Sequence, residues 1–260
     1  MGCCVSHSCD RNIGSYIYNI KVKDVKPIPE KEVEEFKRKY ISNIYLHPED
    51  KGFKERADRA NELMWKRWDW LQKNVETYVN MLRCKGFTDE QIQDCLDGRR
   101  PLAFKTVELH KEFCLDLKTL GAQLEKELGL KNVWFAQTGS AVPGYSSNPH
   151  KGFPDVPSKI TDPENSDVDI VIVAEGVKEW VEKARKEGKK IKDYPCTVDK
   201  DGKKQDCRYG TKHLSEVSQL LVEWEAKWSK KLGGGVQFTF QDGNPIFPPW
   251  ELPVPIENYE

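Results

Sequence analysis

A run of four apolar residues at positions 170–173 follows directly on the triplet Asp167-Val168-Asp169, and this segment constrains the fold more than any other. Alternate residues of a strand point to the same face, so the two aspartates are expected to project together. Because residues 170–173 include no polar side chain, we expect the strand to be buried on both faces in the middle of a sheet. Two carboxylates at the start of such a strand repel each other, and a cation between them would relieve the repulsion.

The chain before this strand has a helical character. Apolar residues recur at intervals of three and four from residue 31 to about residue 84, which predicts helices. Thr88 and Gln91 have the spacing of a capping box that opens a short helix. A longer helix is predicted to end at Gly129, because leucines line one face up to Leu128 and glycine favours a helix stop. Cys84, Cys95 and Cys114 fall in these helical segments, where free buried thiols are expected.

From residue 131 onward strands and helices alternate. We therefore expect an α+β fold with a helical N-terminal region and a mixed β-sheet flanked by helices. The predicted organisation is an N-terminal arm (1–28), a helical region (29–104) and an α/β domain (105–260). The predicted elements of the last part are strands at 133–136, 168–174 and 236–240 and helices at 177–187 and 214–228.

Composition narrows the class of protein. Charged residues make up 32% and hydrophobic residues 38% of the 260 positions, as in folded globular chains rather than disordered ones. The formal net charge of −1 gives no overall field for holding nucleic acid. No apolar run approaches the roughly 20 residues of a transmembrane helix, and the first residues lack the apolar core of a secretory signal. These features predict a cytoplasmic protein.

The first six residues match an acylation pattern. After removal of Met1, Gly2 with a serine at position 6 is an acceptor for N-myristoylation, and Cys3 and Cys4 are placed for S-palmitoylation. One myristoyl chain binds membrane only weakly, so the cysteines would supply the second signal. Such acylation would place the protein on the cytoplasmic face of a membrane. The alternative is a chance match, since glycine followed by a small hydroxyl residue is common.

Gly139 and Ser140 follow the first predicted strand directly. Glycine lets backbone amides approach an anion closely, and the serine hydroxyl adds a donor. Taken alone, the pair could simply end a strand. Its occurrence one strand before an Asp-x-Asp triplet is much rarer than either motif, and the combination predicts an anion and a cation bound together.

These motifs resemble the polymerase-beta-like nucleotidyltransferase superfamily. Three stretches of the sequence are similar to a branch found among bacterial toxin-type domains. They are Gly139-Ser140-Ala141-Val142-Pro143-Gly144, Lys151-Gly152-Phe153-Pro154-Asp155 and Ser166-Asp167-Val168-Asp169-Ile170. The resemblance spans about residues 105–245 and does not include the helical region. It implies a nucleotidyltransferase-type sheet, in which Gly139 and Ser140 contact a nucleoside triphosphate. Asp167 and Asp169 would then bind Mg²⁺, or Mn²⁺ in its place.

The resemblance also implies a third carboxylate on a later strand, and here the sequence departs from the pattern. In the predicted strand at 236–240, Gln237 and Thr239 occupy the expected inward-facing positions, and Asp242 lies just beyond it. Either Asp242 curls back as a third catalytic carboxylate, or the site holds one metal and reacts poorly. Both alternatives stay open from the sequence.

The function that the motifs predict is Mg²⁺-dependent transfer of a nucleoside monophosphate from a nucleoside triphosphate to an acceptor hydroxyl. The acceptor is an RNA, a protein or a second nucleotide, and acylation at Gly2 would make the chain a membrane-anchored effector or signalling enzyme. Two alternatives remain: a nucleotide-binding pseudoenzyme, and a lipid-anchored interaction module that acts through its helical region.

Overall fold

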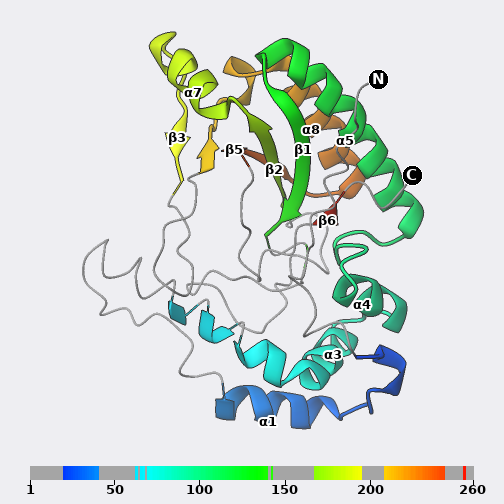
Figure 1. The fold of residues 1–260 in the computed structure, drawn as a ribbon. Coiled ribbons are helices and arrows are strands. Elements are labelled where there is room, and N and C mark those ends of the chain that lie inside the picture. The colour runs from blue at the N-terminus through cyan, green and yellow to red at the C-terminus, as the bar shows by residue number, and fades with distance from the viewer. Residues whose placement is uncertain are drawn as a thin grey trace, which may run out of the picture.

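The computed structural model describes residues 20–40, 62–63, 65–67, 69–139, 142, 167–194, 208–243 and 254–255, with the side chains of 37–40 and 254–255 excepted. This part of the chain has an α+β architecture, as predicted. A group of helices lies at one end, and a mixed sheet with its own helices lies at the other (Figure 1).

The helices at the first end pack around one hydrophobic core. This core joins residues from Val22 to Leu102 and includes the fully buried Leu82 and Ile92. Its helix α4 begins with the predicted capping box, since the Thr88 side chain accepts from the backbone N–H of Gln91 and the Gln91 side chain accepts from the backbone N–H of Thr88. The elements are η1 (Val22–Asp24), α1 (Glu30–Tyr40), α3 (Val75–Cys84) and α4 (Asp89–Leu96).

The sheet has the strand order β3-β4-β5-β2-β1-β6. Strands β2 and β5 run parallel, and the other described pairs are antiparallel, so the predicted mixed sheet is confirmed. As expected from the apolar run, β2 lies between two neighbours, and the side chains of 170–174 are buried. The strands are β1 (Lys131–Thr138), β2 (Val168–Glu175), β3 (Lys192–Asp193), β4 (Arg208–Gly210), β5 (Val236–Asp242) and β6 (Val254–Pro255).

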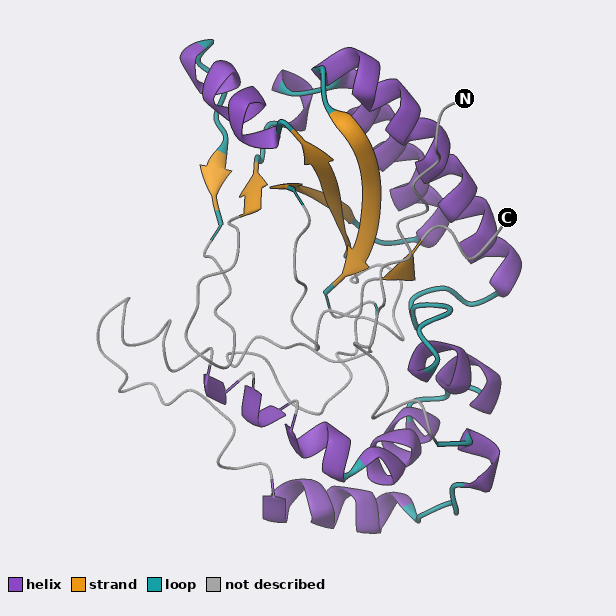
Figure 2. Ribbon diagram, viewed as in Figure 1, coloured by secondary structure: helices purple, strands orange, loops and turns teal. Residues whose placement is uncertain are grey.

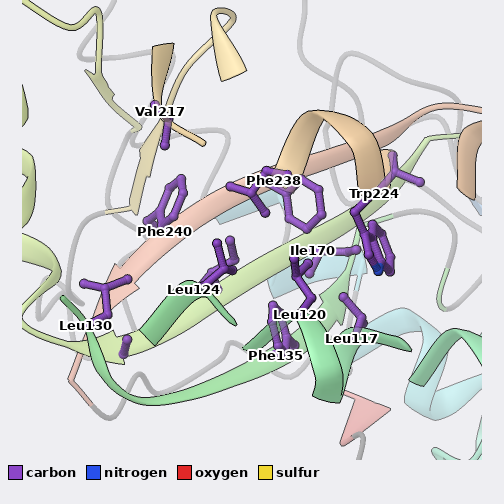
Figure 3. Packing of buried hydrophobic residues seen from close by; sticks show 14 of the residues in the cluster. Leu117, Leu120, Leu124, Leu130, Phe135, Ile170, Val217, Trp224, Phe238 and Phe240 are labelled. Atoms are coloured by element: carbon purple, nitrogen blue, oxygen red, sulfur yellow. The ribbon is translucent and has the colours of Figure 1, made fainter. Parts of the chain in front are cut away.

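Helices pack on one face of this sheet (Figure 2). Alternate strand residues such as Phe135, Ile170 and Phe238 share one core with Leu117 and Trp224 of the covering helices (Figure 3). The longest helix ends at Gly129, which has a left-handed φ of 70°, as its sequence predicted. The helices are α5 (Val107–Leu128), α7 (Val177–Lys186), η3 (Leu214–Glu216) and α8 (Gln219–Leu232).

The chain passes from one core to the other between Leu102 and Phe104. Leu102 belongs to the core of the helical region, and Phe104 belongs to the core beneath the sheet. Cys95 and Cys114 are buried, as predicted for free thiols in these segments, whereas Cys84, the last residue of α3, is exposed. None of the helices in the described ranges has the length and apolarity needed to span a bilayer.

Candidate functional site

The two aspartates of the Asp-x-Asp triplet lie at the N-terminal end of β2. Strand β1 runs antiparallel to β2, so the end of β1 meets the beginning of β2, with Thr138 opposite Asp169. Gly139 is the next residue after β1 and therefore reaches the Asp pair directly. The topology thus brings together two motifs that are separated by 27 residues of sequence between Gly139 and Asp167.

Gly139 and Asp169 are in close contact. Gly139 has a φ of +76°, a backbone conformation that side chains other than glycine rarely adopt. A Cβ atom built on Gly139 would overlap Oδ2 of Asp169. The carboxylate therefore fills the space that any side chain at position 139 would need.

A second glycine stands beside the other aspartate. A Cβ atom built on Gly235 would overlap Oδ1 of Asp167. The carbonyl of Gly235 also accepts a 2.8 Å hydrogen bond from the backbone N–H of Val168, which ties the segment before β5 to the start of β2. Each of the two carboxylates thus packs directly against the main chain of a glycine, Gly139 or Gly235.

Strand β5 contributes an amide at this position. In the parallel register Asp169 lies opposite Gln237, and Nε2 of Gln237 donates a 3.0 Å hydrogen bond to Oδ2 of Asp167. Thr239 lies two residues further along the same face of β5. These two side chains were predicted to face inward, but Gln237 is exposed and Thr239 is partly exposed, and both lie on the face that carries the aspartates.

This face is the one that α5 and α8 do not cover. Val168 and Ile170 point into the core beneath those helices, whereas Val171 belongs to a separate small cluster with Ala136. By alternation Asp169 projects on the side of Val171. The Asp167 side chain is exposed and that of Asp169 is partly exposed, so both carboxylates border solvent.

Asp242 does not join the Asp pair, and the expectation that it curls back as a third catalytic carboxylate is wrong for this geometry. It is the last residue of β5 and lies opposite Ala174, five positions along β2 from Asp169. At about 3.3 Å per residue, this places it about 17 Å from Asp169. Its carboxylate instead accepts from the backbone N–H groups of Gly176, Val177 and Lys178, at 3.1, 3.3 and 3.4 Å, and so caps the start of α7.

Four predicted site residues are not among those that the structure describes. Ser140 and the acylation positions Gly2, Cys3 and Cys4 lie outside the described residues. Of the predicted nucleotide-binding and metal-binding residues, the structure therefore places Gly139, Asp167 and Asp169 and brings these three together.

The donors around the pair suit a hard cation. Two carboxylates and the side-chain amide of Gln237 offer oxygen ligands, which Mg²⁺ prefers, and solvent and phosphate oxygens would complete its shell. Within the described ranges no three His, Cys, Asp or Glu side chains cluster as a complete metal site. The pair therefore fits a cation that is held jointly by protein and ligand.

A buried polar group lies on the opposite side of β1. Gln137 is fully buried, and its Nε2 lies 2.9 Å from Nε2 of His110 on α5. Sγ of Cys114 lies 3.4 Å from the same histidine nitrogen. Burial lowers the pKa of His110 to about 4 and raises the pKa of Cys114 to about 12, so both side chains are neutral near pH 7.

Comparison of the chain with protein families, with curated proteins and with solved structures finds no match. Fold and site together define an α+β protein in which an aspartate pair and a strand-ending glycine meet at one end of a mixed sheet.

Sequence reasoning missed Gly235 and the contact that Gln237 makes with Asp167. Gly233 alone ends α8, with a φ of 72°, and two further glycines follow it. A helix stop needs only one glycine, so the additional glycines at 234 and 235 were the available signal that the main chain is closely approached there. For Gln237 the decisive fact is the parallel register with β2, which no local pattern reveals.

Proposed function

We propose that this chain is a Mg²⁺-dependent nucleotidyltransferase that transfers a nucleoside monophosphate from a nucleoside triphosphate to an acceptor hydroxyl. The observation that carries the proposal is the contact between Gly139 and the Asp169 carboxylate. This contact supports the proposal because it would set an anion-binding main chain at Gly139 directly beside the carboxylates that would hold the cation. A phosphate chain that carries a magnesium ion needs both an anion-binding main chain and oxygen ligands for the metal, side by side.

Each residue has a role in this proposal. Gly139 would present its main chain to the triphosphate, with Ser140 adding a hydroxyl donor. Asp167 and Asp169 would hold Mg²⁺, which when bound neutralises the charge that develops on the transferring phosphoryl group. Gln237 holds the Asp167 carboxylate in place through its 3.0 Å hydrogen bond. The acceptor is an RNA, a protein or a second nucleotide, and acylation at Gly2, Cys3 and Cys4 would bring the reaction to the cytoplasmic face of a membrane.

The test is to incubate the purified protein with each labelled nucleoside triphosphate, Mg²⁺ and cell lysate as a source of acceptors. The Asp167→Asn and Asp169→Asn variants should lose transfer of label while keeping the fold by circular dichroism. Asp193→Asn is the matched control, because Asp193 is an exposed aspartate on β3 that pairs with Arg185 at 2.9 Å, away from the site. Labelling that survives in both site variants would overturn the proposal.

One observation favours a second candidate, a nucleotide-binding protein without turnover. The β5 side chain beside the Asp pair is the amide of Gln237, so β5 supplies a neutral group where a further carboxylate would strengthen cation binding. This candidate predicts a Mg²⁺-dependent rise in melting temperature with nucleoside triphosphate but no label on any acceptor. If nucleotide does not change the melting temperature with Mg²⁺ present, both candidates fail. That result would favour the alternative of a lipid-anchored interaction module.

A further inference from the structure

The main chain three residues beyond Gly139 is attached to the helical region. The carbonyl of Val142 accepts a 3.1 Å hydrogen bond from the backbone N–H of Leu102 and a 3.2 Å hydrogen bond from the thiol of Cys95. Val142 is itself buried, and its N–H donates to the carbonyl of Gly139 at 3.3 Å. Val142, which is bonded to the carbonyl of Gly139, is therefore held by groups from outside the sheet.

The two donors belong to one tightly connected segment. Cys95 lies in α4, and the segment between it and Leu102 turns back on Asp94. The carbonyl of Asp94 accepts from the N–H groups of Arg99 and Arg100, at 2.8 and 3.3 Å. The carboxylate of Asp94 pairs at 2.9 Å with the guanidinium of Arg100, whose side chain is 4% exposed. Breaking such a buried ion pair leaves an uncompensated charge, so the segment resists rearrangement.

We propose that the helical region is a positioning element of the candidate nucleotide site, and that Cys95 and Leu102 act through Val142 to fix the main chain at Gly139. The proposal rests on the proposed function for the role of Gly139 in binding phosphate. Cys95 is a positioning residue, because its thiol bonds the carbonyl of Val142.

The chemistry of the thiol is consistent with this role. Burial raises the pKa of Cys95 to about 12, so the sulfur keeps its proton and remains a donor throughout the neutral range. This role gives the helical region a function at the candidate site, although that region does not resemble the nucleotidyltransferases.

The first experiment measures amide hydrogen exchange in the peptide spanning residues 136–143. Cys95→Val removes the donor and adds about one methyl group, whereas Cys95→Ser keeps a donor in a slightly smaller side chain. Ile92→Val is the control, since Ile92 is a fully buried residue of the same helix and its truncation loosens the same core. We expect exchange in this peptide to rise about three- to fivefold in Cys95→Val alone, as for the loss of one hydrogen bond.

The second measurement is the affinity for nucleoside triphosphate with Mg²⁺. Cys95→Val should weaken binding by a similar factor with kcat nearly unchanged, and Cys95→Ser should restore it. Equal exchange in the Cys95→Val and Ile92→Val proteins would overturn the positioning role, whatever the affinity. If the wild-type protein binds no nucleotide, the proposed function fails, while the exchange result still decides whether Cys95 fixes the turn.

Discussion

The side-chain amide of Gln237 donates a 3.0 Å hydrogen bond to Oδ2 of Asp167, across the parallel pair β2–β5. A neutral donor at this position reduces the repulsion between Asp167 and Asp169 without a cation. The pair can therefore exist in the folded protein before any metal binds. The same contact makes the site sensitive to the charge at position 237.

Gln237→Glu should make the stability of the protein depend on Mg²⁺. The substitution replaces the donor with a third negative charge, so without metal the free energy of unfolding should fall by about 0.5–1 kcal/mol, as for exposed charge pairs. Saturating Mg²⁺ should restore it, because the added carboxylate is an oxygen ligand. Urea denaturation with and without Mg²⁺ measures both values.

Gln219→Glu provides the matched control. Nε2 of Gln219 donates at 3.2 Å to the Glu223 carboxylate on the exposed side of α8, so the same replacement is made far from the Asp pair. Its stability should not respond to Mg²⁺. An equal response in both variants, or in neither, would contradict a cation site beside position 237.

Gly139→Ala should destabilise the protein and abolish nucleotide binding. The methyl group meets the Asp169 carboxylate and also forces alanine to a φ of +76°. We expect a loss of about 2–4 kcal/mol from strain and overpacking together. Gly188→Ala separates the two causes, because Gly188 has a φ of +85° with open space around its Cβ position. It should lose only about 1 kcal/mol and retain binding in thermal-shift titrations with nucleotide and Mg²⁺. Equal losses in the two variants would mean that the contact with Asp169 has no energetic effect.

Asp242→Ala should lower stability without affecting the site. It removes the acceptor for the N–H groups at the start of α7, which typically costs about 1–2 kcal/mol. Asp242→Asn retains one acceptor oxygen and should lose less. Transfer activity per folded molecule should match the wild type in both variants, as measured by labelling below their melting temperatures. Loss of activity in a fully folded Asp242→Asn protein would instead place Asp242 in the chemistry.

Local patterns predicted much of the fold because local physics determines those features. The capping box at Thr88 and the left-handed stop at Gly129 each depend on a few neighbouring residues. The apolar run after Asp169 likewise identified a central strand. Alternation along that strand was enough to place both aspartates on one face.

The remainder of the site depends on pairings between distant segments. Strand β5 follows β2 by about sixty residues, and a shift of its register would exchange the positions opposite Asp169. The side chain beside the pair is Gln237, while Asp242 faces the opposite end of the sheet. No local signal determines such a register, because it depends on which faces of two distant strands are buried when they pair.

His110 should make the stability of the protein fall below pH 6.5. The ring is fully buried, with its centroid 4.7 Å from that of Phe104, and its Nε2 accepts from the Gln137 amide. Burial and, to a smaller extent, the nearby Arg100 charge outweigh the hydrogen bond from Gln137 and lower the pKa of His110 from 6.5 to about 4. Between these two pH values the unfolded chain binds a proton that the folded chain does not. Acidification through this range therefore favours unfolding, by about 2–3 kcal/mol at pH values near 4.5.

His110→Gln isolates this contribution, since glutamine is polar but does not titrate. The neighbouring Cys114 keeps its proton across the whole range, because burial raises its pKa to about 12. Chemical denaturation from about pH 4.5 to 7.5 should show a stability loss that is about 2–3 kcal/mol smaller in the variant than in the wild type. The carboxylates that titrate in the same range are common to both proteins and cancel in the difference. Identical pH profiles would mean that His110 accepts a proton in the folded state as readily as in the unfolded one, and that the group of His110, Cys114 and Gln137 is open to water.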